Sequence, residues 1–278
     1  APRACRRPQR PDATPQQVSL EGTEEVGAPG LLNRGTNVDG GENVGAPGKC
    51  VELLLRPPSD QYLGAQNHSV FTVDEFSSSS ECEALIAAAR ELLASGVKSS
   101  DVIREETRER MPLAASRSAL RLHHTLFRRL LLLVETQLPE LARSLFGQAT
   151  GLHELHASYS AGEPAVNIYT AGGEFAPHTD NENLTVLIPL DLAGAFEGGG
   201  TAFWADSHHR PWSKGESVPN AADRSSWLPP AHVLKLRLGS ALIFGGNVTH
   251  AGLPITSGIR HIYVASFSLK PSLAGRFA

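Results

Sequence analysis

The stretch APHTDNENLTVLIPL, residues 176–190, places His178 and Asp180 two positions apart, shortly before an apolar run. The run LTVLIPL, at 184–190, has the β-branched and apolar content of a buried strand. Side chains at positions i and i+2 of an extended chain point to the same side, so this histidine and this carboxylate can both reach one metal ion. The stretch therefore predicts a strand with a metal site at its entrance.

Short strand patterns recur on both sides of this stretch. From His153 onward, apolar runs alternate with Gly, Asn, Asp and Pro, which end strands and form turns. The predicted strands cover residues 153–159, 165–170, 184–190, 200–205, 232–237, 240–244 and 260–268. Two further strands are expected nearer the N-terminus, at 50–56 (CVELLLR) and 69–76 (SVFTVDEF).

Two helices are predicted between these groups of strands. In SSSSECEALIAAARELLASG, Ser80 and Glu83 fit a capping box and Gly96 can end the helix. A longer helix is predicted over 118–138, with a stripe at Leu122, Leu126, Leu130 and Leu133 or Val134, and a short helical segment then reaches Gly147. Helices followed by many short strands predict a mostly β fold, a β-sandwich buttressed by N-terminal helices.

Composition indicates one folded domain behind a leader. Residues 1–48 are rich in Pro, Gly and polar residues and contain VGAPG twice, so we expect them to be disordered, and residues 49–278 to fold. The net charge of -4 gives no reason to expect nucleic acid as a partner. No apolar run approaches the ~20 residues of a membrane span. The three cysteines contain no CxxC, which argues against a disulfide framework or a zinc knuckle.

A third metal ligand is available downstream. His250, in GSALIFGGNVTHAGLPITSGIR at 239–260, follows a predicted strand and a Gly-rich turn that can bring a distant strand beside the first. Two histidines and one carboxylate with open positions form the ligand set of non-haem Fe(II) oxygenases. The three-residue pattern His-x-Asp alone would equally fit hydrogen-bonded residues at the end of a strand. The prediction of a metal therefore depends on His250.

Arg260 begins the apolar strand HIYVASFSL, ten residues beyond His250. This setting would carry its guanidinium into the sandwich beside the metal. A buried arginine is costly unless it is paired. A bound dicarboxylate would supply the partner, because the planar guanidinium matches a carboxylate through two hydrogen bonds. A surface arginine that pairs with Asp or Glu is the alternative.

The remaining histidine pairs are not expected to form a second metal site. Adjacent side chains diverge, so solvent exposure is expected for His208-His209 and for His123-His124. His153 and His156 would face opposite sides of a strand.

From Ala165 to Ser268 the chain resembles the 2-oxoglutarate- and Fe(II)-dependent dioxygenases of the prolyl 4-hydroxylase and lysyl hydroxylase type. The resemblance rests on an ordered set of motifs: PHTD, LTVLIPL, FEGGGTAFW, GSALIFGG, THAGLPITSGIRH and YVASF. Upstream, FTVDEFSSSSECEALI resembles the segment that leads into the first helix of these enzymes. The fold that this implies is the double-stranded β-helix, a jelly roll shared with cupins, and residues 49–278 would form the catalytic domain.

The resemblance assigns roles to five residues. His178, Asp180 and His250 would hold Fe(II), and Arg260 would anchor a carboxylate of 2-oxoglutarate where many prolyl hydroxylases have Lys. Tyr169, in NIYTAGG, stands where the family often places a tyrosine hydroxyl on the same carboxylate; an ordinary core aromatic is the alternative. The implied cofactors are Fe(II), 2-oxoglutarate and O2, with ascorbate as an additional candidate. The implied reaction hydroxylates a C–H bond and releases succinate and CO2.

The substrate remains open at this point. Peptidyl proline is favoured over lysine, a free amino acid or another small molecule, although FEGGGTAFW and Arg260 are closer to the lysyl hydroxylase pattern. The long loop at 206–231 is predicted to be a lid over the substrate. Candidate substrate contacts are Asn181, Trp204 and Trp212.

Two other classes of protein fit parts of the pattern. A cupin-like metalloenzyme would use the same triad without 2-oxoglutarate, but it would leave Arg260 and Tyr169 without a role. A non-catalytic binding module would have no need of all three ligands. The resemblance allows the secretory pathway, and Asn67-His-Ser is a glycosylation sequon, yet similar sequons at Asn183 and Asn247 lie close to the predicted ligands. The compartment and the oligomeric state stay open.

Overall fold

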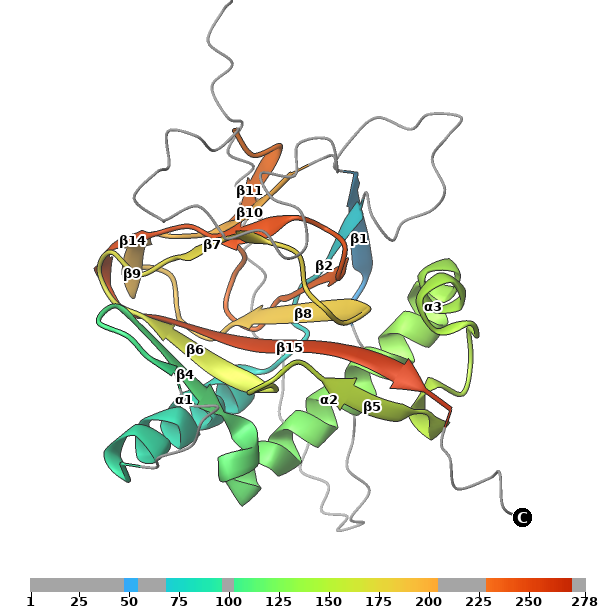
Figure 1. Cartoon of the computed structure of the whole chain (residues 1–278), viewed down its shortest axis with the longest axis horizontal. Coiled ribbons are helices and arrows are strands. Elements are labelled where there is room, and N and C mark those ends of the chain that lie inside the picture. The colour runs from blue at the N-terminus through green and yellow to red at the C-terminus, as the bar shows by residue number, and fades with distance from the viewer. Residues whose placement is uncertain (1–47, 55–68, 97–102, 205–228, 272–278) are drawn as a thin grey trace, which may run out of the picture.

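The computed structural model of the chain describes residues 48–54, 69–96, 103–204 and 229–271, which form two facing β-sheets with helices on one outer side (Figure 1). Nearly all of the predicted leader lies outside these residues. The same holds for residues 205–228, which contain most of the predicted lid and with it Trp212 and His208-His209. None of the helices in these ranges is long and apolar enough to cross a membrane.

Helix α1 (Ser79–Ala94) begins earlier than its capping pattern predicted. The Ser78 side chain accepts from the Glu81 N–H, and the Glu81 carboxylate accepts from the Ser78 N–H, so the capping box is Ser78 with Glu81 and not Ser80 with Glu83. The run of four serines fits the pattern in either register. A tertiary contact favours the observed one, because Arg129 of the next helix donates two hydrogen bonds to Glu81, at 3.0 and 2.9 Å.

Helix α2 (Arg117–Gln137) matches the predicted helix within a residue at each end, and α3 (Pro139–Phe146) follows it and ends at left-handed Gly147. The prediction that His123 is exposed was wrong. Its ring is 1% exposed, with Nδ1 2.8 Å from the Tyr263 hydroxyl and Nε2 3.0 Å from the Tyr159 hydroxyl. Burial lowers the pKa of His123 to about 4. A histidine can occupy an apolar helix face when tertiary partners satisfy both ring nitrogens.

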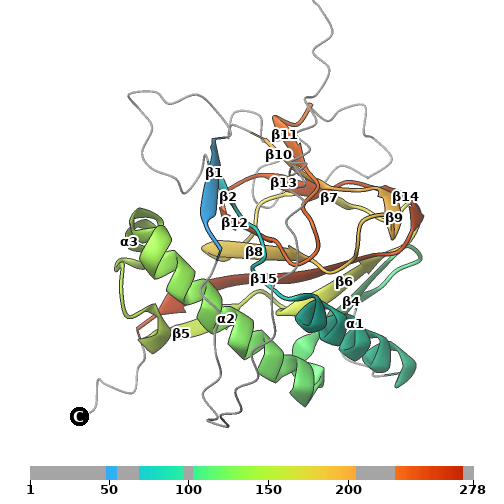
Figure 2. The same cartoon turned by 180° about the vertical axis from the view of Figure 1, so that it is seen from behind.

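The larger sheet has the strand order β1-β2-β12-β8-β15-β6-β4-β3, and β5 pairs with β15. Its strands are β1 (Cys50–Leu54), β2 (Ser69–Val73), β3 (Ile103–Arg104), β4 (Arg108–Pro112), β5 (His156–Tyr159), β6 (Ala165–Tyr169), β8 (Leu184–Pro189), β12 (Ala241–Gly245) and β15 (Arg260–Lys270). All pairings in it are antiparallel. The three helices cover one face of this sheet (Figure 2).

A smaller antiparallel sheet lies over the opposite face (Figure 1). It has the order β11-β10-β13-β7, and β14 pairs with β9 beside it. These strands are β7 (Phe175–His178), β9 (Phe196–Gly198), β10 (Thr201–Phe203), β11 (His232–Leu234), β13 (His250–Gly252) and β14 (Ile255–Gly258). Short 3-10 turns lie at η2 (Leu113–Ala115) and η3 (Leu152–Glu154). The predicted fold class, a mostly β jelly roll buttressed by N-terminal helices, is confirmed.

Several short strands were not predicted. The segments of β7, β13 and β4 read FAPH, HAG and RERMP, which show no alternation of apolar and polar residues. Strands of this kind are defined by their partners in the sheet and not by their own sequence. The predicted strand at 153–159 begins only at His156, because His153 belongs to η3.

Alternation along β15 divides the molecule into two interiors. Tyr263, Ala265 and Phe267 join the core that contains the helices, whereas Ile262 and Val264 join the core between the two sheets. Successive side chains of a strand point to opposite faces, so Arg260 lies on the same side as Ile262 and Val264. The space between the sheets is therefore where the predicted site residues meet.

Candidate metal centre and its pocket

His178, Asp180 and His250 come together between the two sheets. One ligand atom from each lies within 4.8 Å of the other two. Nε2 of His178 is 3.5 Å from Oδ1 of Asp180, and Nε2 of His250 is 3.8 Å from Oδ2. Within the described part of the chain, no other three His, Cys, Asp or Glu residues form such a group. The structure thus gathers the three residues that the sequence nominated.

Two different strands and one turn position these ligands. His178 is the last residue of β7 and pairs directly with His250, the first residue of β13. Asp180 lies beyond the strand, where its N–H donates to the Gly246 carbonyl at 2.9 Å. Only glycine fits at 246, because an added Cβ would lie 1.8 Å from the Glu182 carbonyl oxygen. The carboxylate reaches the histidines through this turn, which precedes the strand that the sequence predicted at 184–190.

Both histidines are held in the tautomer that a metal requires. Nδ1 of His178 donates to the Ala176 carbonyl at 2.8 Å, and Nδ1 of His250 donates to the Val248 carbonyl at 3.1 Å. A carbonyl only accepts, so Nδ1 carries the proton in each ring and Nε2 keeps its lone pair. Burial, and next the neighbouring His178, lowers the pKa of His250 to about 4, although Asp180 opposes this. His250 is therefore neutral at neutral pH and able to bind a cation.

Asp180 is held in its charged form. Burial acts to raise its pKa, but His250, His178 and the Thr185 hydroxyl together hold the pKa well below its usual range. The Thr185 hydroxyl donates to Oδ2 of this carboxylate. The negative charge of this buried carboxylate is one that a divalent cation bound by the triad would neutralise.

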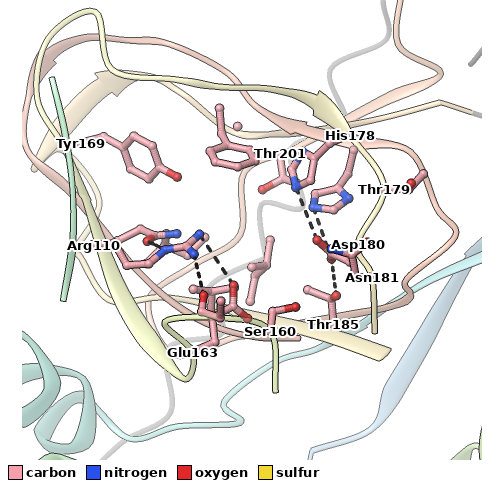
Figure 3. A pocket seen from close by; sticks show the side chains of 18 of the residues that line it. Arg110, Ser160, Glu163, Tyr169, His178, Thr179, Asp180, Asn181, Thr185 and Thr201 are labelled. Atoms are coloured by element: carbon pink, nitrogen blue, oxygen red, sulfur yellow. Dashed lines mark hydrogen bonds and ion pairs between the residues drawn. The ribbon is translucent and has the colours of Figure 1, made fainter. Parts of the chain in front are cut away.

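The triad opens into a cavity of about 280 Å³. Figure 3 shows His178, Asp180 and Thr185 on one side of it, with Tyr169 and Arg110 on the opposite side. The walls between them include the apolar side chains of Leu187, Ile262 and Val264. A small molecule in this cavity would contact the triad at one end and the two opposite residues at the other.

Arg260 lines the same cavity and is 6% exposed. Its guanidinium makes only long contacts, from Nη1 to the Gly200 carbonyl at 3.3 Å and from Nη2 to the Thr201 hydroxyl at 3.4 Å. In the residues that the structure describes, no carboxylate lies within ion-pair distance of it, so the alternative of a surface arginine paired with Asp or Glu is wrong. A buried cation with these partners has capacity for an anion.

Tyr169 is the direct cross-strand partner of Arg260 and stands with its ring 5.8 Å from the guanidinium carbon. Burial raises the pKa of its hydroxyl, although Arg260 opposes this, so the phenol stays protonated and can donate a hydrogen bond. Tyr169 also belongs to the apolar core between the sheets. Tyr169 is therefore a core aromatic that also lines the pocket, and its contact with a cosubstrate carboxylate stays a prediction.

Two of the three predicted substrate contacts, Asn181 and Trp204, are among the described residues. Asn181 is exposed and lines the pocket. Trp204 is 4% exposed and packs with Ala202 and Ala251, and it is not among the pocket-lining residues. Trp212 lies outside the described residues. Of the two candidates that the structure describes, Asn181 is placed where a substrate could touch it and Trp204 is not.

The sequence interpretation missed several pocket residues, which are Arg110, Ser160, Glu163, Asn167 and Thr185. Thr185 could have been found, because alternation along the predicted strand 184–190 puts it on the side opposite Val186. Arg110 could not, because the strand that carries it was not recognised. Its place becomes clear only from its pairing with Asn167 of β6.

Comparison with known proteins adds similarity at the level of whole structures only. No protein-family model matches the sequence, and no curated protein matches it. Among solved structures, a prolyl-4-hydroxylase from Pseudomonas putida shares 15% identity, over 72% of this chain and 92% of that chain, with a TM-score of 0.46. The viral collagen prolyl hydroxylase vCPH from Paramecium Bursaria Chlorella virus-1, in its 2OG complex, shares 16%, over 72% and 94%, with a TM-score of 0.41. HygX from Streptomyces hygroscopicus, with nickel and 2-oxoglutarate bound, shares 15%, over 73% and 83%, with a TM-score of 0.44.

Proposed function

We propose that this chain is an Fe(II)- and 2-oxoglutarate-dependent oxygenase that hydroxylates a C–H bond of a peptidyl proline. One observation carries the proposal: the triad of His178, Asp180 and His250 and the buried guanidinium of Arg260 line a single cavity. A metal site alone would not call for a buried arginine, and an anion site alone would not call for the triad.

The donor set fits a divalent transition metal with open coordination positions. Two imidazole nitrogens and one carboxylate favour iron over magnesium or calcium, which prefer oxygen ligands. Fe(II), 2-oxoglutarate and O2 together would supply the oxidising power that converts a C–H bond into an alcohol, with succinate and CO2 as co-products. The residues of this chain bind and orient these groups.

The far end of the cavity fits a carboxylate. Arg260 can replace its two long contacts by two hydrogen bonds to a carboxylate, and Tyr169 can donate a third. A 2-oxoglutarate molecule held in this way would have its keto acid directed toward the triad. The apolar side chains of Leu187, Ile262 and Val264 line the cavity and keep water from its walls.

Peptidyl proline is the substrate that we infer from the motifs. The ordered set from PHTD to YVASF resembles prolyl 4-hydroxylases, and the lysyl hydroxylase likeness of FEGGGTAFW is the reason to include lysine as the second substrate to test. The exposed position of Asn181 at the pocket is consistent with a substrate that approaches from outside.

The proposal is tested by an anaerobic titration of the metal-free protein with Fe(II) and then with 2-oxoglutarate. We expect a saturable visible charge-transfer band from the chelated keto acid. The band should disappear in His178→Ala and weaken in Arg260→Ala, and it should be unchanged in His153→Ala and Arg143→Ala, which alter exposed residues of the same types. Metal binding without a band would refute the use of 2-oxoglutarate and favour a cupin-like enzyme.

Assay of substrates follows from a positive titration. Peptides that contain proline should stimulate the formation of succinate and gain one oxygen atom in mass, whereas matched peptides with alanine in place of proline should not. Stimulation by lysine peptides alone would refute the assignment of proline and leave the oxygenase assignment intact.

A further inference from the structure

Part of the pocket has no role in the proposed chemistry. Arg110, Glu163 and Asn167 line the cavity, and Figure 3 shows Arg110 and Glu163 side by side, across from the triad. The three residues come from β4, the turn before β6, and β6 itself. They are neither metal ligands nor contacts of Arg260.

Arg110 is fixed in place but has a donor to spare. Its Nε donates to Oδ1 of Asn167 at 3.1 Å, and Nη1 donates to the Ala161 carbonyl at 3.4 Å. Nη2 faces Oε1 of Glu163 at 3.7 Å, which is too long for a hydrogen bond. The side chain is 15% exposed and lines the cavity, so most of the guanidinium is withdrawn from bulk solvent.

Glu163 is buried to a similar extent, with its side chain 7% exposed. Its Oε2 accepts from the Ser266 N–H, while the distant Arg110 is the only partner of Oε1 among the residues that the structure describes. Burial raises the pKa of Glu163 to about 7 even though Arg110 opposes the shift. At this separation the Nη2 donor of Arg110 and the Oε1 acceptor of Glu163 do not form a hydrogen bond with each other. A ligand in the cavity can supply the missing hydrogen bonds to both.

We infer that Arg110 and Glu163 form a subsite for the two neutral backbone amides that flank the reacting residue of the substrate. Nη2 of Arg110 donates to the carbonyl of the preceding amide, and Oε1 of Glu163 accepts from the N–H of the following amide. This inference rests on the proposed function, and it adds that the enzyme distinguishes a peptide from a free amino acid by the group next to the reacting residue.

Charge balance favours an amide over an ion at this subsite. Above pH 7, where Glu163 is a carboxylate, the cation and the carboxylate compensate each other, so the subsite carries no net charge. A substrate carboxylate would compete with Glu163 for Arg110, and a substrate ammonium would compete with Arg110 for Glu163. The flanking amides offer one acceptor and one donor, require no further charge to be buried, and make hydrogen bonds to charged partners, which are the stronger kind.

The inference is tested with three probes that differ in one group: N-acetyl-L-proline methylamide, its methyl ester, and the free acid. The ester keeps the carbonyl and lacks the N–H. Dissociation constants are measured by NMR titration on the metal-free protein, and again on protein with Mn(II) and 2-oxoglutarate in the absence of O2. We expect the methylamide to bind about tenfold more tightly than the ester, the value of one hydrogen bond to a charged group.

Glu163→Gln is the decisive variant. It keeps an oxygen for the Ser266 N–H and replaces the free acceptor by an NH2 donor, so the preference for amide over ester should fall to about one. Arg110→Gln should weaken the methylamide and the ester by the same factor, because both present a carbonyl. Glu154→Gln, at an exposed glutamate, serves as the matched control. Thermal melting of each variant confirms that it is folded.

Three results with bound probes would overturn the inference. The first is equal binding of the methylamide and the ester to the wild type, and the second is an unchanged preference for the methylamide in Glu163→Gln. The third is that the free acid binds most tightly and that this binding is lost in Arg110→Gln, which would indicate an acidic substrate. Absence of binding of all probes to both protein forms would also overturn it. None of these results depends on the charge-transfer band, so failure of the subsite and failure of the proposed function are distinguishable.

Discussion

Replacing Thr185 by valine tests whether the carboxylate of the triad is oriented by the larger sheet. Thr185 is 1% exposed, and its hydroxyl donates to Oδ2 of Asp180. Valine has nearly the same shape, so the variant removes one donor and leaves packing in place. The carboxylate would then be free to rotate, and its negative charge would lose a partner.

The expected loss follows from the role of this hydrogen bond. Removing a group that orients a metal ligand reduces metal affinity about 10- to 100-fold, which is roughly 1.4–2.8 kcal/mol. The Thr185 hydroxyl also contributes to the lowered pKa of Asp180, so the pKa rises in the variant. Protons then compete more strongly with the metal, and binding should be lost at a higher pH when the solution is acidified.

The assay is an anaerobic competition between the protein and a chromophoric chelator for Fe(II), repeated from pH 8 to pH 5. Thr72→Val is the control, because Thr72 is a buried threonine of the same sheet, on β2, outside the pocket lining. Equal affinity of Thr185→Val and the wild type would refute the reasoning. So would an equal loss in both variants, since that would show a general effect of losing a strand hydroxyl.

Three further predictions concern stability. Because burial lowers the pKa of His123 to about 4, the unfolded chain binds a proton that the folded chain does not. The protonation of His123 should therefore not change the free energy of unfolding above pH 6.5, and this free energy should fall by up to ~3 kcal/mol as the pH drops from 6.5 to 4, as measured by urea denaturation. His123→Gln should flatten this pH dependence. Glu81→Ala should lower the free energy of unfolding by ~1–3 kcal/mol in the same measurement, since it breaks the helix cap and the hydrogen bonds from Arg129 of α2. Glu83→Ala should change it little, and equal losses in the two variants would contradict the observed helix start. Gly246→Ala should lower both the melting temperature and the affinity for Fe(II), because its Cβ would meet the carbonyl of residue 182, and a variant with wild-type values would contradict the turn geometry.

The sequence by itself determined the long elements and nominated the three residues of the triad. The repeat of leucines predicted α2 within a residue at each end, because a long amphipathic pattern has many positions that agree. His178, Asp180, His250 and Arg260 were nominated because few residue types bind metals or carboxylates, and those types stood beside strand and turn signals.

Only the tertiary structure decided how those residues meet. Strands as short as β7 and β13 have no pattern of their own, and their pairing sets His178 against His250. The choice of capping box needed Arg129, a residue from another helix.

The partly satisfied pair of Arg110 and Glu163 joins a strand and a turn that are far apart in sequence. Contacts between distant segments depend on the register of neighbouring strands. No local pattern of residues encodes that register, and for this reason the ligands could be predicted from the sequence but the opposite wall of their pocket could not.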